Sequence, residues 1–283
     1  MKHLKYFFLI AISIASSCNI EHNEIIDKEK TNAVSDSLIS VQNNTKMVYI
    51  PGGVYKPFYG TDSASVKVEP FLIDERPVTN QEYLEFVIAN PQWRKSNIKR
   101  IFADSSYLKS WTSDTTLSDS ALANAPICEV SWFACKAFAK SVHKRMPTLD
   151  EWEFVAMADE VSPNARKKPQ YSDAIIDLYL QKDRQFQAVK NTKPNYWGVY
   201  NMFDLIWEWT DDFNSVLTTG ESRGGQYDDK GLFCAASATS ATDVLNYAAF
   251  MRFALRGSIK ANYTIANLGF RCAKDTTFTS PKP

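Results

Sequence analysis

The sequence predicts one domain of mixed α and β structure with long irregular segments. Two short runs rich in β-branched and aromatic residues, 47–53 and 66–74, predict strands. Three segments place apolar residues at helical spacing behind a capping residue, namely 77–87, 130–142 and 147–157. The remaining chain has many aromatic residues and few regular periods. An α+β class with much irregular structure is therefore expected.

Both strands are expected at the beginning of the domain. The run 47–50 is stopped by the Pro-Gly-Gly sequence at 51–53, which is typical of a turn. The run 66–74 alternates apolar and polar residues at its start, as a half-buried strand does.

The first helix is expected directly after these strands. Thr79 or Asn80 can cap it, because either side chain can accept a hydrogen bond from the first free backbone amides. Its apolar residues Tyr83, Phe86 and Val87 fall on one face.

The second and third helices also begin at capping residues. Ser131 can cap a helix that runs to residue 142, and Thr148 forms a capping box with Glu151 at the start of the third. A further short helix is indicated at 175–180. The segment 91–125 is expected to be irregular and packed down by its aromatic residues.

Composition and charge argue against a nucleic-acid partner. The chain has 283 residues, of which 45% are hydrophobic and 23% charged, as in ordinary globular proteins. Its 32 basic residues balance 32 acidic ones, so no basic field is present to attract nucleic acid.

The amino terminus predicts export. Lys2 and Lys5 precede a short apolar run from Tyr6 to Ala15, which is typical of a signal peptide over residues 1–17. Small residues before Cys18 resemble a bacterial lipoprotein cleavage site, with Cys18 as the lipidated first residue. The expectation is a periplasmic or outer-membrane lipoprotein held at the membrane by its lipid anchor. The alternative is a plain secretory signal with an incidental cysteine.

Three further segments follow from composition. Residues 18–45 are polar and lack an apolar period, which predicts a flexible tether after the anchor. Residues 46–275 form the folded domain, and 276–283 are expected to be a disordered tail.

Short motifs occur along this domain in a fixed order. They are Pro77–Tyr83, Val130-Ser131-Trp132, Trp207-Glu208-Trp209, Arg223-Gly224-Gly225 and Asn267–Cys272. In this order they resemble the landmarks of the formylglycine-generating, or sulfatase-modifying factor, domain family. The resemblance covers about residues 46–275. It implies a single α+β domain related to C-type lectins, a complex fold with much irregular structure.

The resemblance also implies a chemistry whose key residues are missing. Family enzymes oxidise a cysteine of a client protein, using copper held by two cysteines five residues apart after the Arg-Gly-Gly segment. Counted forward from that segment, these positions are Asp229 and Cys234; counted back from Cys272, they are Asp243 and Ala248. Neither count yields the pair, so whether the domain is an enzyme is left open and no catalytic residue is assigned.

Cys234 is nevertheless a candidate catalytic residue and copper ligand, with help from a methionine or histidine. The alternative for Cys234 is a small buried hydrophobic residue. In the family, the cysteine of the Phe-Arg-Cys ending pairs with one on the helix after Val-Ser-Trp. A Cys135–Cys272 disulfide is therefore a candidate, with two buried free thiols as the alternative.

The resemblance implies a calcium site near the Trp-Glu-Trp segment, for which Asp204 and Glu208 are the candidate ligands. The alternative gives Glu208 a structural part, in which it satisfies buried backbone groups between two tryptophans of the core. The arginines are expected to be structural as well, paired with carboxylates such as Glu151 or Glu153. These arginines are Arg252, Arg256 and Arg271. A pocket in which an arginine holds a client peptide is the alternative.

Two segments, 101–108 and 243–272, resemble one subgroup of the family, the accessory proteins encoded beside copper nitrite reductases. The resulting expectation is an accessory, maturation or client-binding module, whose client is a protein such as a copper enzyme. One alternative is a copper-dependent oxidoreductase that uses Cys234 on a protein cysteine. Another is a structural envelope lipoprotein of the gliding or secretion type.

Overall fold

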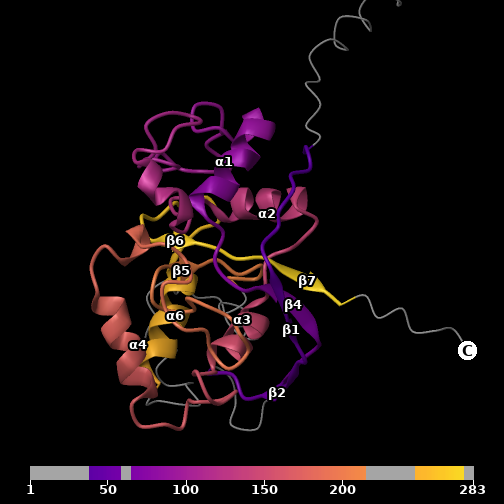
Figure 1. Ribbon diagram of the computed structural model, residues 1–283, viewed down its shortest axis with the longest axis vertical. Coiled ribbons are helices and arrows are strands. Elements are labelled where there is room, and N and C mark those ends of the chain that lie inside the picture. Colours follow the sequence, from indigo (N-terminus) through magenta and orange to yellow (C-terminus); the bar gives the residue numbers. More distant parts are fainter. Residues whose placement is uncertain (1–37, 59–64, 215–245, 277–283) are drawn as a thin grey trace, which may run out of the picture. The chain divides into compact units, whose positions relative to one another are not determined.

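A three-stranded antiparallel sheet joins the beginning of the domain to its end. Its strands are β1 (Met47–Ile50), β4 (Phe71–Asp74) and β7 (Ala273–Asp275), in the order β1-β4-β7 (Figure 1). The computed structural model describes residues 38–58, 65–214 and 246–276. The central strand β4 is thus flanked by chain from both ends of the domain.

Two smaller sheets complete the β structure of the described chain. β2 (Gly53–Tyr55) pairs antiparallel with β3 (Val66–Val68), and β5 (Trp207–Glu208) pairs parallel with β6 (Leu268–Gly269). The predicted strand 66–74 is therefore two strands, because Pro70 cannot donate to a ladder and ends the pairing with β2. A Cβ at Gly269 would lie 2.1 Å from the carbonyl oxygen of Ile127, so only glycine fits there.

Helices surround these sheets. The α-helices are α1 (Asn80–Ala89), α2 (Trp132–Ser141), α3 (Leu149–Ala156), α4 (Tyr171–Leu180) and α6 (Tyr247–Ser258). Short 3-10 turns are η1 (Pro91–Trp93), η2 (Ser120–Asn124) and η3 (Arg184–Phe186). The segment 91–125 otherwise lacks regular structure, as predicted.

The caps predicted from the sequence are present. Thr79 and Thr148 each form a reciprocal capping box with the glutamate three residues later, and Ser131 accepts a hydrogen bond from the amide of Ala134. α4 is longer than the predicted helix at 175–180, since it begins at Tyr171.

α6 was not expected, and its composition explains why. Its buried face contains Arg252 and Arg256 beside Ala248, Ala249 and Phe253. Two charged residues on the core face remove the apolar period by which a helix is recognised. The structure corrects the expectation of an irregular chain at this point.

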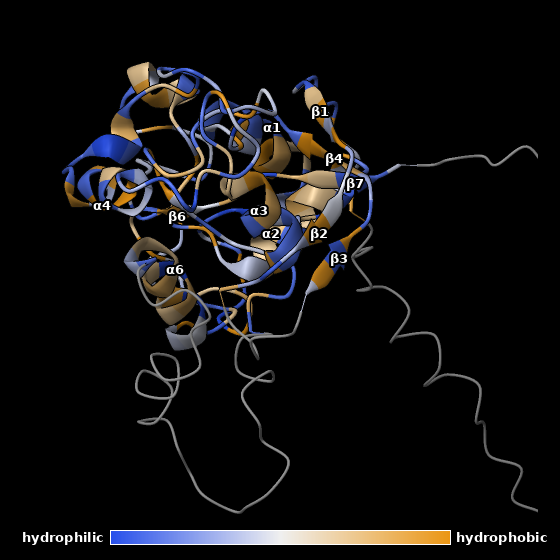
Figure 2. Cartoon of the chain, turned by 90° about the horizontal axis from the view of Figure 1, so that it is seen from below, coloured by the Kyte–Doolittle hydropathy of each residue, from blue (hydrophilic) through white to orange (hydrophobic). Residues whose placement is uncertain are grey.

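Apolar side chains form two large buried clusters. The first lies around α1 and α2 and includes Tyr83, Phe138 and Phe270, whose rings pack within 6.5 Å of one another. In the second, residues of β1, β2 and β4 pack with residues of α3, including Trp152. Figure 2 shows hydrophobic residues along these elements. The irregular segment 91–125 contributes Tyr107 and Trp111 to the first cluster and is therefore held by aromatic packing.

The domain begins earlier than the sequence predicted. The side chain of Asn90 accepts a hydrogen bond from the amide of Ile39 at 2.7 Å and donates to its carbonyl at 3.1 Å. The amide of Val41 donates to the carbonyl of Ser141 at 2.9 Å. Residues 38–45, which the sequence assigns to the tether, are thus docked against the ends of α1 and α2 in this structure.

The predicted signal 1–17, Cys18 and the tail beyond Thr276 lie outside the described residues. Among the helices in the described ranges, none combines the length and hydropathy that a bilayer crossing requires.

Candidate functional site

Ala248 marks the place where the family chemistry is expected. Counted back from Cys272, it corresponds to the second of the two cysteines, and it lies in the first turn of α6. It is fully buried, in a cluster with Ala165, Tyr171 and Ile175. The other counted positions, Asp229, Cys234 and Asp243, lie outside the described residues. α6 begins at the cap Asn246, whose side chain accepts from the amide of Ala249 at 3.0 Å.

A buried carboxylate on α3 anchors α6. Glu153 accepts hydrogen bonds from Arg252 at 2.9 and 2.7 Å and from Arg256 at 2.9 Å. Both guanidinium groups lie over the ring of Trp152, at 5.6 and 4.8 Å from its centroid. Burial alone would raise the pKa of Glu153, but the two arginines hold it below its ordinary value. The predicted pairing of these arginines with Glu153 is confirmed.

The second buried ion pair connects β5 to the Phe-Arg-Cys ending. Arg271 donates to Glu208 at 2.8 Å through both Nε and Nη2, and Trp152 donates to the same carboxylate at 2.8 Å. Arg271 also donates to the backbone carbonyls of Tyr200 and Asn201, both at 3.0 Å. It is therefore Arg271 that satisfies buried backbone, while Glu208 neutralises the arginine.

These contacts bear on the candidate calcium ligands. Within the described ranges, the hydrogen bonds to the carboxylate of Glu208 come from Arg271 and Trp152. Asp204 instead accepts from Thr192 at 2.8 Å and from Asn201 at 2.9 Å, so Asp204 and Glu208 share no partner. In the described part of the chain, no three His, Cys, Asp or Glu side chains are arranged to hold a metal ion. Within the described residues, Glu208 pairs with Arg271 and accepts from Trp152, and Arg271, where the alternative interpretation has Glu208, makes the contacts with buried backbone.

The cysteines of the described chain are unsuited to thiolate chemistry. Cys135 and Cys272 are free thiols and lie buried in one cluster, so the disulfide implied by the resemblance is not formed in this structure. Burial raises the pKa of both thiols, and the carboxylate of Asp74 raises that of Cys272 further. Burial, with Glu129, likewise raises the pKa of the half-buried Cys128. A protonated thiol is neither a good nucleophile nor a good copper ligand.

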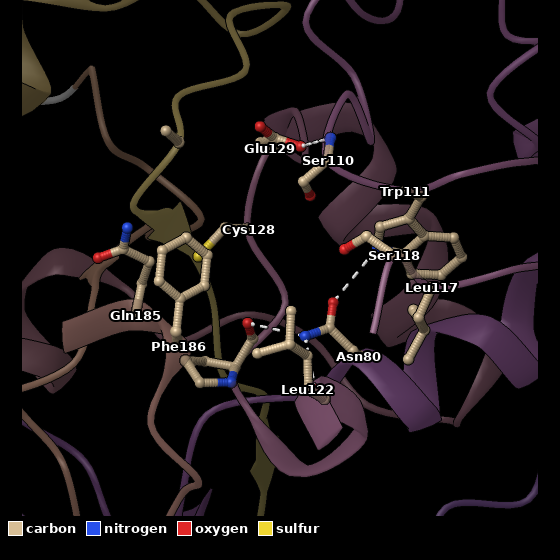
Figure 3. A pocket seen from close by; sticks show the side chains of 12 residues that line it. Asn80, Ser110, Trp111, Leu117, Ser118, Leu122, Cys128, Glu129, Gln185 and Phe186 are labelled. Atoms are coloured by element: carbon tan, nitrogen blue, oxygen red, sulfur yellow. Dashed lines mark hydrogen bonds between the residues drawn. The ribbon is translucent and has the colours of Figure 1, made fainter. Parts of the chain in front are cut away.

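Cys128 lines a small pocket of about 70 Å³ (Figure 3). Asn80 in its wall donates to the carbonyls of Leu122 and Ala125 and accepts from the indole of Trp111 at 3.3 Å. The volume of the pocket is well below the roughly 300 Å³ at which ligand pockets begin. The side-chain amide of Asn80 is already engaged by these three hydrogen bonds. The hydrogen bonds of Asn80 therefore hold the loop 110–128 in place, and the pocket offers little room for a ligand.

The two segments of subgroup-like sequence lie side by side. The amide of Asp104 donates to the carbonyl of Asn262 at 2.9 Å, and Asp104 accepts from the amide of Thr264 at 3.2 Å. This junction carries exposed apolar side chains: Ile101 is 71% exposed, and Phe102 and Tyr263 are each 36% exposed. We refer to Ile101, Phe102 and Tyr263 as the exposed apolar patch. Nothing in the sequence of the two segments indicates that they touch, because the contacts join residues about 160 positions apart.

An α+β domain with the Trp-Glu-Trp and Phe-Arg-Cys segments joined by a buried ion pair is a domain of the sulfatase-modifying factor type. The chain belongs to this family: the family's sequence model, described as Sulfatase-modifying factor enzyme 1-like domain, matches residues 36–276. The start of this match agrees with the docked segment that begins at Leu38.

Individual relatives share about a quarter of the sequence. The chain is 27% identical over 263 residues to the formylglycine-generating enzyme of Streptomyces coelicolor, covering 76% of this chain and 82% of that protein. It is 26% identical over 277 residues to inactive C-alpha-formylglycine-generating enzyme 2 of Bos taurus, covering 80% and 87%. Among solved structures it is similar to PvdO from Pseudomonas aeruginosa, with 17% identity, a TM-score of 0.43 and coverage of 81% and 94%.

Proposed function

We propose that the protein is an exported accessory protein that binds a client protein without oxidising it. The observation that carries the proposal is the packing of Ala248, which is the second cysteine position of the family when the count runs back from Cys272. A methyl side chain in contact with Ala165, Tyr171 and Ile175 neither binds copper nor forms a thiolate. The similarity to a bovine relative named as inactive supports a fold that is kept after its chemistry is lost.

The client that we propose is a copper enzyme, with copper nitrite reductase as the first candidate. Segments 101–108 and 243–272 resemble accessory proteins encoded beside that enzyme, and the contacts of Asp104 with Asn262 and Thr264 join the two segments. Their junction presents the exposed apolar patch, which is the kind of surface that protein interfaces use. We therefore assign client docking to this patch.

A binding measurement tests this assignment. Immobilised full-length protein is titrated with the copper nitrite reductase of the same genome, and Ile101→Asp is compared with the unaltered chain. A charge at the centre of an apolar contact is expected to weaken binding by about tenfold or more. Val161→Asp is the matched control, because Val161 is 75% exposed but lies outside the patch. Equal loss in both variants, or no binding by the unaltered chain, would remove this client from the proposal.

The proposal includes attachment to the membrane through a lipid on Cys18. This anchor would hold the protein outside the cytoplasm, where it would meet its client. Labelling of producing cells with an alkyne-bearing fatty acid tests it. Incorporation that disappears in Cys18→Ala is the expected result, whereas incorporation that persists would place any acylation elsewhere.

A copper-dependent oxidoreductase is the second candidate, because the forward count puts Cys234 at the second cysteine position. Copper(I) titration of the reduced full-length protein, with Cys234→Ala in parallel, separates the two functions. Under the accessory function, the unaltered chain and the variant give the same weak binding. Tight stoichiometric binding that is lost in Cys234→Ala, together with oxygen-dependent consumption of a cysteine peptide, would establish the oxidoreductase instead.

A further inference from the structure

α4 and the segment 192–204 line a cavity of about 430 Å³, which falls within the range of small-molecule sites. Ile175 and Leu178 of α4 and Met202 of the segment give it an apolar wall. α4 packs along α6, so this wall is held in place by the body of the domain (Figure 1). The cavity is distinct from the exposed apolar patch, and none of its lining residues belongs to that patch.

The charges in the cavity lining are unequal. Three carboxylates and two lysines line it. Lys168 pairs with Asp159, and Lys193 pairs with Glu160 at 3.4 Å. Asp204 is the remaining carboxylate, and it forms no ion pair within the described part of the chain. The uncompensated charge of the lining is therefore negative.

Asp204 also has unused hydrogen-bonding capacity. Its Oδ2 atom accepts from Thr192 at 2.8 Å and from Asn201 at 2.9 Å, whereas its buried Oδ1 atom has no hydrogen-bond partner in the described chain. Arg184, whose charge interacts with that of Asp204, directs its guanidinium to the carbonyls of Leu178 and Phe203, at 3.1 and 2.7 Å, and no ion pair joins it to Asp204 in the described chain. The negative charge of Asp204 is shared by both carboxylate oxygens, so a cationic group in the cavity beside this residue would be stabilised.

We propose that this cavity binds a small ligand with an apolar body and one ammonium group. The body lies against Ile175, Leu178 and Met202, and the ammonium lies beside Asp204. The negative lining disfavours the matching carboxylic acid, because its charge would face Asp204 without a free lysine to pair with. The site is independent of the client-binding function, since it uses none of the residues assigned to docking.

Isothermal titration of the full-length protein with tryptamine and with indole-3-propionate tests the proposal, because the two probes share an indole body and differ in the sign of their charge. Tryptamine is expected to bind about tenfold more tightly. In Asp204→Asn, which keeps an acceptor for Thr192 and Asn201, this preference is expected to disappear. Asp177→Asn removes an exposed carboxylate of α4 that does not line the cavity and is expected to leave the preference in place.

A second variant tests the cavity itself. Ala174 lines the cavity on the exposed side of α4, so Ala174→Phe fills it without entering the core and is expected to abolish binding of tryptamine. Leu180→Phe enlarges a side chain that is 72% exposed on the same helix outside the cavity and is expected to bind normally. The proposal is overturned if neither probe binds, if both bind equally, or if Asp204→Asn retains the preference for tryptamine.

Discussion

Arg271 and Glu208 form an ion pair in which neither side chain is exposed. Removing one partner from such a pair leaves a buried charge uncompensated, which costs about 3–5 kcal/mol. Glu208→Gln is therefore expected to lower the free energy of unfolding by about that amount at pH 7, measured by urea denaturation. Trp152 keeps an acceptor in this variant, so the loss reports on the charge of Glu208.

An exposed ion pair provides the comparison for Glu208→Gln. Glu160 and Lys193 lie 3.4 Å apart with side chains 58% and 78% exposed, and Glu160→Gln is expected to change stability by less than about 1 kcal/mol. If the two glutamine variants unfold at the same urea concentration, the buried pair does not stabilise the domain in the way its geometry indicates.

The cysteines give a second prediction at the scale of single residues. Cys135 and Cys272 are completely buried, and their raised pKa values keep them protonated. Alkylation of the non-reduced native protein is expected to leave both unlabelled, and alkylation after unfolding is expected to label both. If both stay unlabelled in the unfolded, non-reduced protein, they form the disulfide that the family resemblance implies.

Sequence alone predicted some of these residue pairings and missed others. Arg252 and Arg256 were expected to meet a carboxylate such as Glu153, because a buried guanidinium needs a counter-charge. Glu208 was considered as a calcium ligand, and nothing in the sequence shows that Arg271 reaches it across 63 residues. Asp204 likewise gave no sign that it lines a cavity, because the opposite wall comes from α4.

At the scale of elements, α1 depends on the carboxylate of Glu82. This side chain accepts from Arg76 at 2.9 and 3.0 Å, from the amide of Thr79 at 2.8 Å, and from the hydroxyl of Thr45. Burial opposes its ionisation, but the hydrogen bonds and charge of Arg76, with those from Thr45 and Thr79, outweigh burial and lower the pKa of Glu82 to about 2. Glu82 thus joins α1 to the docked segment that precedes β1.

This pKa predicts a loss of stability in acid. Between the ordinary glutamate value of 4.5 and the native value of about 2, the unfolded chain binds a proton that the native chain does not. Stability from Glu82 is therefore complete above pH 4.5 and is lost as the pH falls through 2, by about 3 kcal/mol. The stability difference between the unaltered chain and Glu82→Gln, from urea denaturation at several pH values, is expected to shrink over that range.

Glu85→Gln is the control for the acid experiment, because Glu85 is exposed on the same helix. Its stability difference from the unaltered chain is expected to vary little with pH. A difference for Glu82→Gln that is constant from pH 5 to pH 2 would contradict the assignment of the lowered pKa to Glu82.

Elements with local signals were predictable, and those defined by distant contacts were not. Thr79, Ser131 and Thr148 each stand directly before the helix that they cap. Three helices can therefore be located from local sequence alone. α6 lacks such a signal, since Arg252 and Arg256 point into the core towards Glu153, about a hundred residues earlier. β5 and β6 are two residues long and exist only through their mutual pairing.

At the scale of the whole domain, the sheet β1-β4-β7 joins the beginning of the described domain to its end. The amide of Asp74 donates to the carbonyl of Cys272 at 2.8 Å, and Lys144 donates to the carboxylate of Asp74 at 2.6 Å. Lys144 also donates to Asn43 at 3.0 Å, which ties the docked segment 38–45 to this sheet. The segment is predicted as tether because its polar composition has no apolar period, and its contacts are hydrogen bonds of backbone and polar side chains, which leave no such period in the sequence.

The boundary of the domain is therefore a testable property. A chain that begins at residue 46 loses the two hydrogen bonds between Ile39 and Asn90, the bond of Val41 to Ser141, and the packing of Leu38 and Val41 on the first apolar cluster. We expect it to be less stable than a chain that begins at residue 34 by on the order of 2–4 kcal/mol, measured by urea denaturation with tryptophan fluorescence.

Asn90→Ala in the longer chain is expected to reproduce part of the loss, because Asn90 is fully buried between Ile39 and Phe86. The same substitution in the shorter chain should cost less, since the bonds to Ile39 are already gone. Equal stability of the two chains would mean that residues 38–45 do not belong to the cooperative domain, and that the flexible tether extends to residue 45 as the sequence first indicated.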